Sequence, residues 1–233
     1  MKRWSGARLG TGSVLSAWAG LFWFLLVTGR TSLYLSTRTA WLIPVGAVLL
    51  SAAAVGRLAS ARVVAPERLS TRETWVMGLI AVPVVLLVAL PPATLGAYSV
   101  NRRASFAGTG IGASARIVSG PLDFVDVGAA QSFDAANQQL QARAGEQIVL
   151  EGIVTTDASL GPGEFLLTRY IVTCCVADAT VAQVRVVDAP SGSIAKDEWV
   201  RVTGSVYPLG REVLVAADTI EQIPVPDDPY LTP

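Results

Sequence analysis

The residues of this 233-residue chain best suited to chemistry are two adjacent cysteines, Cys174 and Cys175, in the stretch TRYIVTCCVADA. They are the only cysteines, and the chain has no histidine. Asp178 follows three residues later, so two thiols and a carboxylate are close in sequence. Thiolates and carboxylates are ligands for borderline and soft cations such as zinc and copper. The stretch therefore predicts a candidate metal site of Cys174, Cys175 and Asp178, with a fourth ligand from water, another carboxylate or a partner.

The local geometry leaves other interpretations open. Neighbouring side chains of a regular strand point to opposite faces, so the two thiols can share a ligand only where the strand ends or bulges. A disulfide between them would be strained, because consecutive Cα atoms are about 3.8 Å apart and disulfides usually need about 4.4 to 6.8 Å. Two small buried residues in a β-rich core are a further alternative. The nearby charge of Arg169 is expected to favour the thiolate.

Charge divides the chain into two halves with different surroundings. Residues 1–103 carry eleven basic and two acidic residues, net +9, whereas residues 104–233 carry seven basic and sixteen acidic residues, net −9. An acidic domain repels phosphate, so we expect no nucleic-acid partner. The missing histidine also excludes Ser-His hydrolysis and histidine-metal chemistry.

The first half is predicted to lie in a lipid bilayer. Hydrophobic residues make up 52% of the chain, charged residues make up 15%, and the mean hydropathy is +0.49. Three stretches without charge, about 13–29, 40–56 and 75–96, have the length of transmembrane helices. Residues 1–96 are therefore expected to form a transmembrane region.

The basic residues predict the orientation of this region. The amino terminus and the second loop together carry seven Lys and Arg, and the first loop carries Arg30 and Arg38. Because basic residues are retained on the cytoplasmic side, we expect a cytoplasmic amino terminus and an extracytoplasmic carboxy-terminal domain of a multi-pass cell-membrane protein. A first or second segment that only enters the interface would reverse this orientation.

The second half is expected to be an all-β, OB-like five-stranded barrel, with an open sandwich of the same strands as the alternative. Residues 97–131 are rich in Gly, Ala and Ser and predict a tether with short extended pieces at 115–120 and 122–128. Residues 132–233 would form the domain, with a short helix within 132–147 and an extended arm at 224–231. The predicted strands are 147–154, 164–175, 182–189, 198–208 and 211–223.

Several strings resemble the YcgQ-like family of bacterial membrane proteins, which are regarded as permease subunits. They are GPGEF, TRYIVTCCVADA, WVRVTGSV, IPVPDDPYL and the PPATLG junction, and the resemblance covers the chain from about residue 75 onward. Ala104 departs from the glycine expected at its position. The resemblance implies a larger multi-span permease as partner, and it adds Arg169 and Tyr170 to the site as supporting residues.

These observations favour a non-enzymatic accessory membrane subunit whose external barrel binds or gates a thiophilic metal ion. A membrane-tethered thiol-disulfide oxidoreductase is the main alternative, although redox motifs normally separate their thiols as C-x-x-C. A structural membrane-anchored module is the third.

Overall fold

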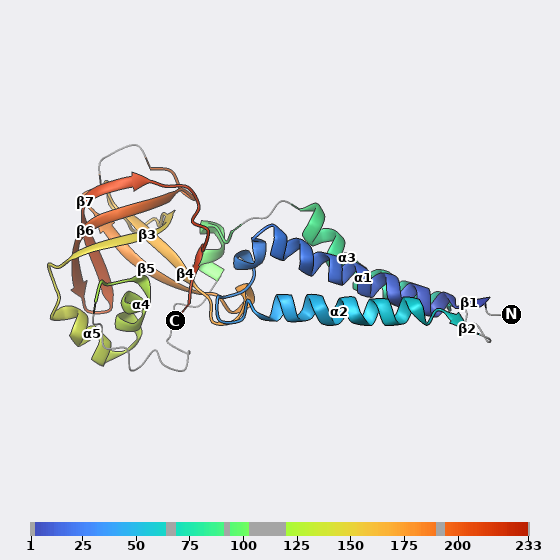
Figure 1. Cartoon of the computed structure of the whole chain (residues 1–233). Helices are drawn as coiled ribbons and strands as arrows, with labels where there is room; N and C mark the ends of the chain where they lie inside the picture. Colours follow the sequence, from blue (N-terminus) through green and yellow to red (C-terminus); the bar gives the residue numbers. More distant parts are fainter. Residues whose placement is uncertain (1–2, 64–68, 91–93, 103–119, 190–193, 233) are drawn as a thin grey trace. The chain divides into compact units, whose positions relative to one another are not determined.

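The computed structural model describes residues 3–63, 69–90, 94–102, 120–189 and 194–232 (Figure 1). The chain forms two compact units, Met1–Pro92 and Ala93–Pro233. Most of the extended piece expected at 115–120 lies outside the described residues.

The first unit consists of three long apolar helices, as expected. They are α1 (Gly6–Val27), α2 (Leu42–Ala59) and α3 (Thr71–Ala89), with the 3₁₀ turn η1 (Arg30–Leu33) after α1. The most apolar 18-residue windows have mean hydropathies of 1.5, 1.9 and 1.7. At about 1.5 Å per residue, each helix is about as long as the roughly 30 Å hydrocarbon layer is thick. By length and composition the three helices are candidate membrane spans, and they suggest a multi-pass membrane protein.

The helix ends differ from the expected spans. α1 begins at Gly6 rather than near residue 13, because Arg8 is tolerated in its first turns and donates to the Ser60 carbonyl at 2.7 Å. α3 ends at Ala89 rather than near residue 96. Leu90 is extended (φ −82°, ψ 140°) and precedes Pro91, which disfavours the helical conformation of the residue before it.

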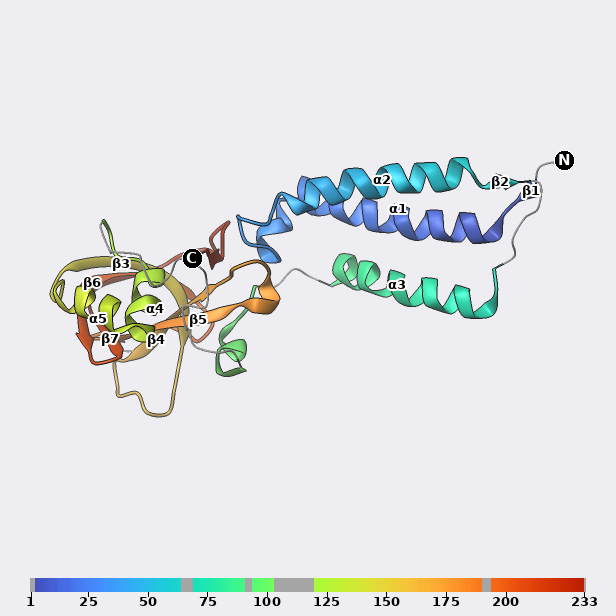
Figure 2. The ribbon, with the colours of Figure 1, turned by 90° about the horizontal axis from the view of Figure 1, so that it is seen from below.

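Helices α1 and α2 lie side by side because small residues let them approach (Figure 2). Phe22 packs on Gly46, where an added Cβ would lie 2.6 Å from the ring. Leu58 packs on Gly12 in the same way, at 2.5 Å. The two-residue strands β1 (Arg3–Trp4) and β2 (Arg62–Val63) pair antiparallel next to these helices.

The second unit contains a closed five-stranded mixed β-barrel. Its strands are β3 (Gln147–Thr155), β4 (Phe165–Ile171), β5 (Thr180–Val187), β6 (Trp199–Leu209) and β7 (Glu212–Gln222). They follow the order β3-β6-β7-β5-β4, and β4 pairs with β3 to close the barrel. All five strands of the predicted barrel are confirmed, with the largest difference at β4, which ends four residues before the predicted end at Cys175.

Within the described residues 120–146, two α-helices precede the barrel, and the first corrects the prediction for residues 122–128. Instead of an extended piece, helix α4 (Phe124–Ser132) forms, with Phe124 and Val127 buried in the barrel core. Asp123 caps it by accepting from the N–H groups of Val125 and Asp126 at 2.8 and 2.9 Å. The helix predicted within 132–147 is α5 (Asp134–Gln141).

A second apolar cluster is separate from the barrel core. Its buried members are Val100, Ile153, Tyr170, Val172, Ala179, Val181, Trp199 and Tyr230. Val100 belongs to the 3₁₀ helix η2 (Ala97–Arg102), in the region that the sequence predicts to be a tether. Tyr230 belongs to β8 (Tyr230–Leu231), which pairs parallel to the end of β4. The predicted extended arm at 224–231 thus ends as a short strand on the barrel.

Candidate functional site

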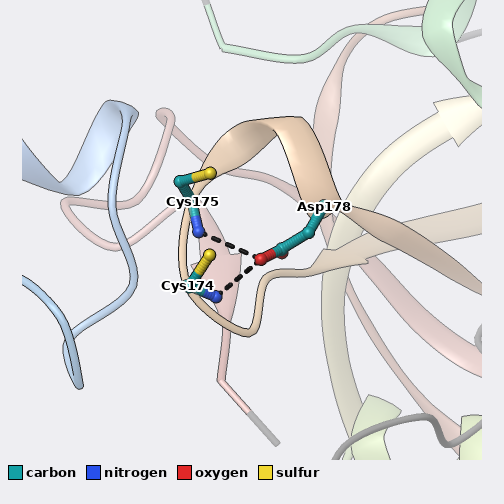
Figure 3. A group of neighbouring side chains, drawn as sticks. All are labelled: Cys174, Cys175 and Asp178. Carbon is teal, nitrogen blue, oxygen red and sulfur yellow. Dashed lines mark hydrogen bonds between the residues drawn. The ribbon is translucent and has the colours of Figure 1, made fainter.

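Cys174 and Cys175 lie in the connection between β4 and β5 (Figure 3). Val172 before them and Ala179 after them belong to the second cluster. Strand β4 ends at Ile171, and the N–H of the following Val172 donates to the Leu231 carbonyl at 2.8 Å. The chain then turns through the cysteines into the short 3₁₀ helix η4 (Val176–Asp178). The thiols are therefore not on opposite faces of a regular strand. The condition stated above for two neighbouring thiols to share one ligand, that the strand ends before the cysteines, is therefore met.

Asp178 holds this connection in shape. Its carboxylate accepts three backbone hydrogen bonds. The N–H of Thr173 donates at 2.9 Å, and Figure 3 shows the bonds from the N–H groups of Cys174 at 2.8 Å and Cys175 at 3.2 Å. In return, the Asp178 N–H donates to the Cys175 carbonyl at 2.9 Å. The side chains of Cys175 and Asp178 form a reciprocal capping box at the start of η4. We name residues 173–178 the thiol loop.

The thiol loop brings the three predicted ligands together. Cys174 is exposed and Cys175 is half-buried, and neither forms a disulfide. The two Sγ atoms and a carboxylate oxygen of Asp178 all lie within 4.8 Å of one another. Zinc binds sulfur at about 2.3 Å, so two sulfurs on one ion are at most about 4.6 Å apart. Small side-chain movements would therefore suffice to place all three atoms around one cation.

The electrostatics of the loop keep Cys174 protonated at neutral pH. Its hydrogen bonds to Asp178 and Cys175, with burial and the carboxylate charge, raise the pKa of Cys174 to about 12. Burial acts to raise the pKa of Asp178, but hydrogen bonds from Cys174 and from the three backbone N–H groups outweigh it and lower this pKa. The expectation that Arg169 favours the Cys174 thiolate is therefore wrong, because the carboxylate of Asp178 is the charge that acts on this thiol.

Arg169 instead joins parts of the barrel domain. It is 5% exposed, and its guanidinium donates to the carbonyls of Glu151 at 3.1 Å and Asp228 at 2.8 Å. It also lies over the Trp199 ring, 4.8 Å from the ring centroid. Desolvation lowers the pKa of Arg169 to about 10, against the opposing charges of Glu151 and Asp228. Arg169 thus holds the carboxy-terminal arm against β3 and β4.

The contacts of Tyr170 also join parts of the barrel domain. It is 1% exposed, its hydroxyl donates to the Gly96 carbonyl at 2.7 Å, and its ring meets Tyr230 edge to face at 6.4 Å between centroids. Tyr230 and Leu231 lie in the predicted extended arm but were not among the predicted site residues, and they pair with the end of β4, the strand that leads into the thiol loop. The two adjacent apolar residues of the PYL segment were the available signal, but two residues are too few to predict a strand.

The comparisons with known proteins concern the second unit. A search of curated proteins gives no match. The model of the DUF1980 C-terminal domain matches residues 129–233, from the middle of α4 to the end of the chain. The matched part contains the thiol loop and the whole barrel, and it leaves out the membrane helices. The resemblance to the YcgQ-like permease subunits stays a prediction, whereas residues 129–233 are similar to the DUF1980 C-terminal domain.

Proposed function

We propose that this protein is an accessory membrane subunit whose barrel domain binds a thiophilic cation, zinc or copper, through Cys174 and Cys175. The observation that carries the proposal is the convergence of two thiols, which form no disulfide, and one carboxylate within 4.8 Å on a hydrogen-bonded loop. Soft thiolate ligands select such metals over magnesium or calcium. The exposed Cys174 leaves the loop accessible to an incoming ion.

Asp178 would have a double role in this site. Its three backbone N–H bonds and the Cys174 thiol use about four acceptor positions, which is the full capacity of a carboxylate. A cation that replaces the Cys174 proton releases one of these positions. Asp178 could then serve as a third ligand while its N–H bonds keep the loop in place. Water or a partner residue would complete a zinc site, whereas copper(I) needs fewer ligands.

Metal titration of the full-length protein in detergent micelles tests this proposal. Chelator-treated protein would be titrated with zinc(II) and, separately, with copper(I) under reducing conditions, each against a competing chromophoric chelator. We expect about one equivalent of bound metal, with binding lost in Cys174→Ser and in Cys175→Ser. Thr173→Ser is the matched control, because it changes the loop without removing a ligand. Unchanged binding in both cysteine variants would contradict the proposal.

The subunit role rests on the membrane helices and on the resemblance to permease subunits. Across these three helices only a few polar side chains are available at membrane depth, which is a poor basis for a transport pathway by themselves. We therefore propose a larger multi-span permease as partner, with the amino terminus cytoplasmic and the barrel extracytoplasmic. Affinity purification after mild solubilisation should recover that partner in stoichiometric amount. A protein that runs alone from membranes containing the permease would contradict this role.

The raised pKa of Cys174 opposes thiol-disulfide exchange, and it also opposes metal binding, because both need the thiolate. Thiol-disulfide exchange proceeds through the thiolate, and redox enzymes lower the pKa of the attacking cysteine. In this loop the pKa moves in the opposite direction. Turnover of a model dithiol that required Cys174 would nevertheless favour the thiol-disulfide oxidoreductase alternative.

A further inference from the structure

The thiol loop and the segment that follows α3 pack into the same small cluster. Val172 and Ala179 flank the thiol loop, are 0% and 5% exposed and belong to the second cluster, and Val176 of the loop packs against this cluster. Val100 and Leu95, from the segment after α3, pack against the same cluster. We name residues 95–102 the post-helix segment. A change in the packing of one of these elements therefore affects the space available to the other.

Three side chains of the barrel domain hold the post-helix segment by its backbone. The Leu95 N–H donates to the Tyr230 hydroxyl at 3.1 Å, and the Gly96 carbonyl accepts from the Tyr170 hydroxyl at 2.7 Å. The Ala97 N–H donates to the Asp197 carboxylate at 2.6 Å. These bonds join residues 74 to 135 positions apart in the sequence. The post-helix segment is thus docked at a specific place on the domain.

Tyr230 connects this docking to the thiol loop through short steps. Its hydroxyl holds Leu95, and its ring contacts Tyr170 edge to face. The next residue, Leu231, accepts the N–H of Val172, two residues before Cys174. Each step of this route from the post-helix segment to the thiol loop is a hydrogen bond, a ring contact or a bond along the chain. Packed interiors rearrange between discrete arrangements rather than deform gradually, so such a route can transmit a local change.

We propose that metal binding at the thiol loop and docking of the post-helix segment favour each other, through Tyr230 and Tyr170. This inference rests on the proposed metal site and adds its regulation. A cation that joins Cys174 to Cys175 restricts the loop, and docking restricts the same cluster from the other side. Whichever event comes first bears part of the ordering cost, so the second becomes more favourable. Because the post-helix segment follows α3 in the chain, metal occupancy would change how firmly the residues directly after the membrane region are docked.

The test measures both directions of this coupling on the full-length protein in detergent micelles. Amide hydrogen exchange of residues 95–100 is compared without metal and with saturating zinc(II) or copper(I), whichever binds. We expect metal to slow this exchange. In the second direction, Tyr230→Phe removes the acceptor of the Leu95 N–H but keeps the ring, and it should weaken metal binding by roughly five-fold or more, the lower end of typical allosteric couplings. Tyr207→Phe, at an exposed tyrosine of β6, is the matched control and should leave the affinity unchanged.

The outcomes separate this inference from the proposed function. Metal binding that depends on the cysteines, with unchanged exchange at residues 95–100 and equal affinities for Tyr230→Phe and Tyr207→Phe, would overturn the coupling and leave the metal site standing. Faster exchange on metal binding would also overturn it. If the wild-type protein binds neither metal, both the site and its coupling are wrong.

Discussion

At the residue scale, Asp178 determines both the shape and the reactivity of the thiol loop. One carboxylate accepts the N–H groups of three consecutive residues and also raises the pKa of Cys174. A metal must displace the Cys174 proton, so binding should strengthen as the pH rises, because fewer thiols remain protonated. The same carboxylate therefore fixes the geometry of the loop and lowers the reactivity of the Cys174 thiol at neutral pH.

We predict that Cys174 alkylates slowly and that Asp178→Asn accelerates it. Iodoacetamide reacts with the thiolate, and a pKa of about 12 leaves far less thiolate at pH 8.5 than the reference pKa of about 8.5 does. Asp178→Asn removes the negative charge, so the pKa of Cys174 should fall. The rate would be followed by mass spectrometry in a Cys175→Ser background, with free cysteine as the reference. A wild-type rate equal to that of free cysteine would contradict the prediction.

Arg169 should matter for stability, and its role does not require contact with metal. Arg169→Met keeps an unbranched chain but leaves the carbonyls of Glu151 and Asp228 without their donor. We expect destabilisation of about 1 to 3 kcal/mol, seen as a lower apparent Tm by circular dichroism in micelles. Arg201→Met is the control, because Arg201 makes exposed ion pairs with Glu151 and Glu221, which contribute little. Equal effects of the two substitutions would show that the buried position of Arg169 is not decisive.

The sequence was sufficient to predict that the three candidate ligands lie close together, but not what surrounds them. Cys174, Cys175 and Asp178 are close in sequence, so any turn brings them together. The charge acting on Cys174 was assigned to Arg169 because it is nearby in sequence. The direction of the Arg169 side chain depends on Trp199 and Asp228, which are 30 or more positions away, and no local pattern contains that information.

At the element scale, the close approach of α1 and α2 depends on two glycines. We predict that Gly46→Ile separates these helices, because even a Cβ would lie 2.6 Å from Phe22. Gly56→Ile on the same helix is the control, since no atom lies within 4 Å of its Cβ position. The apparent Tm of the full-length protein in micelles should fall for Gly46→Ile and change little for Gly56→Ile. A fall of equal size in both would mean that α2 tolerates no β-branched residue at either position, whatever its packing.

The barrel has a comparable close approach at the register shift between Thr203 and Gly204 on β6. A Cβ at Gly204 would lie 2.1 Å from the Ala216 carbonyl oxygen, which is backbone and cannot move aside. We therefore expect Gly204→Ala to destabilise the domain by about 1 to 3 kcal/mol, measured as above. Gly161→Ala, where the Cβ meets only the flexible Glu164 carboxylate at 3.3 Å, should stay near the wild-type value. A stable Gly204→Ala protein would show that the shift at this position can relax.

Secondary structure was predictable where the apolar residues of a segment follow one clear repeat. The strands alternate or are apolar throughout, and all five were found from the sequence. Helix α4 was missed because LDFVDVG is a short and mostly apolar stretch, which does not distinguish a strand from a buried helix. Its helical state comes from the capping box of Asp123 and Asp126 and from burial against the barrel, and a short apolar run does not reveal burial.

At the scale of the whole molecule, the proposed orientation predicts which loops face outward. In a Cys174→Ser/Cys175→Ser background, Ala158→Cys places a thiol on the exposed β3–β4 connection, and Ser60→Cys places one after α2. A membrane-impermeant maleimide added to intact cells should label Ala158→Cys and should not label Ser60→Cys. The reverse pattern would show that the barrel faces the cytoplasm.

The parallel pairing of β8 with β4 also has a consequence for biosynthesis. Leu231 is translated sixty residues after its partner Ile171. At about 5 to 20 residues per second, the ribosome needs roughly 3 to 12 s to make this interval. During that time the two vicinal thiols have already been made while the strand that anchors their loop has not. The nascent chain therefore passes through a period in which Cys174 and Cys175 are open to oxidants and metals without the constraint of the folded domain.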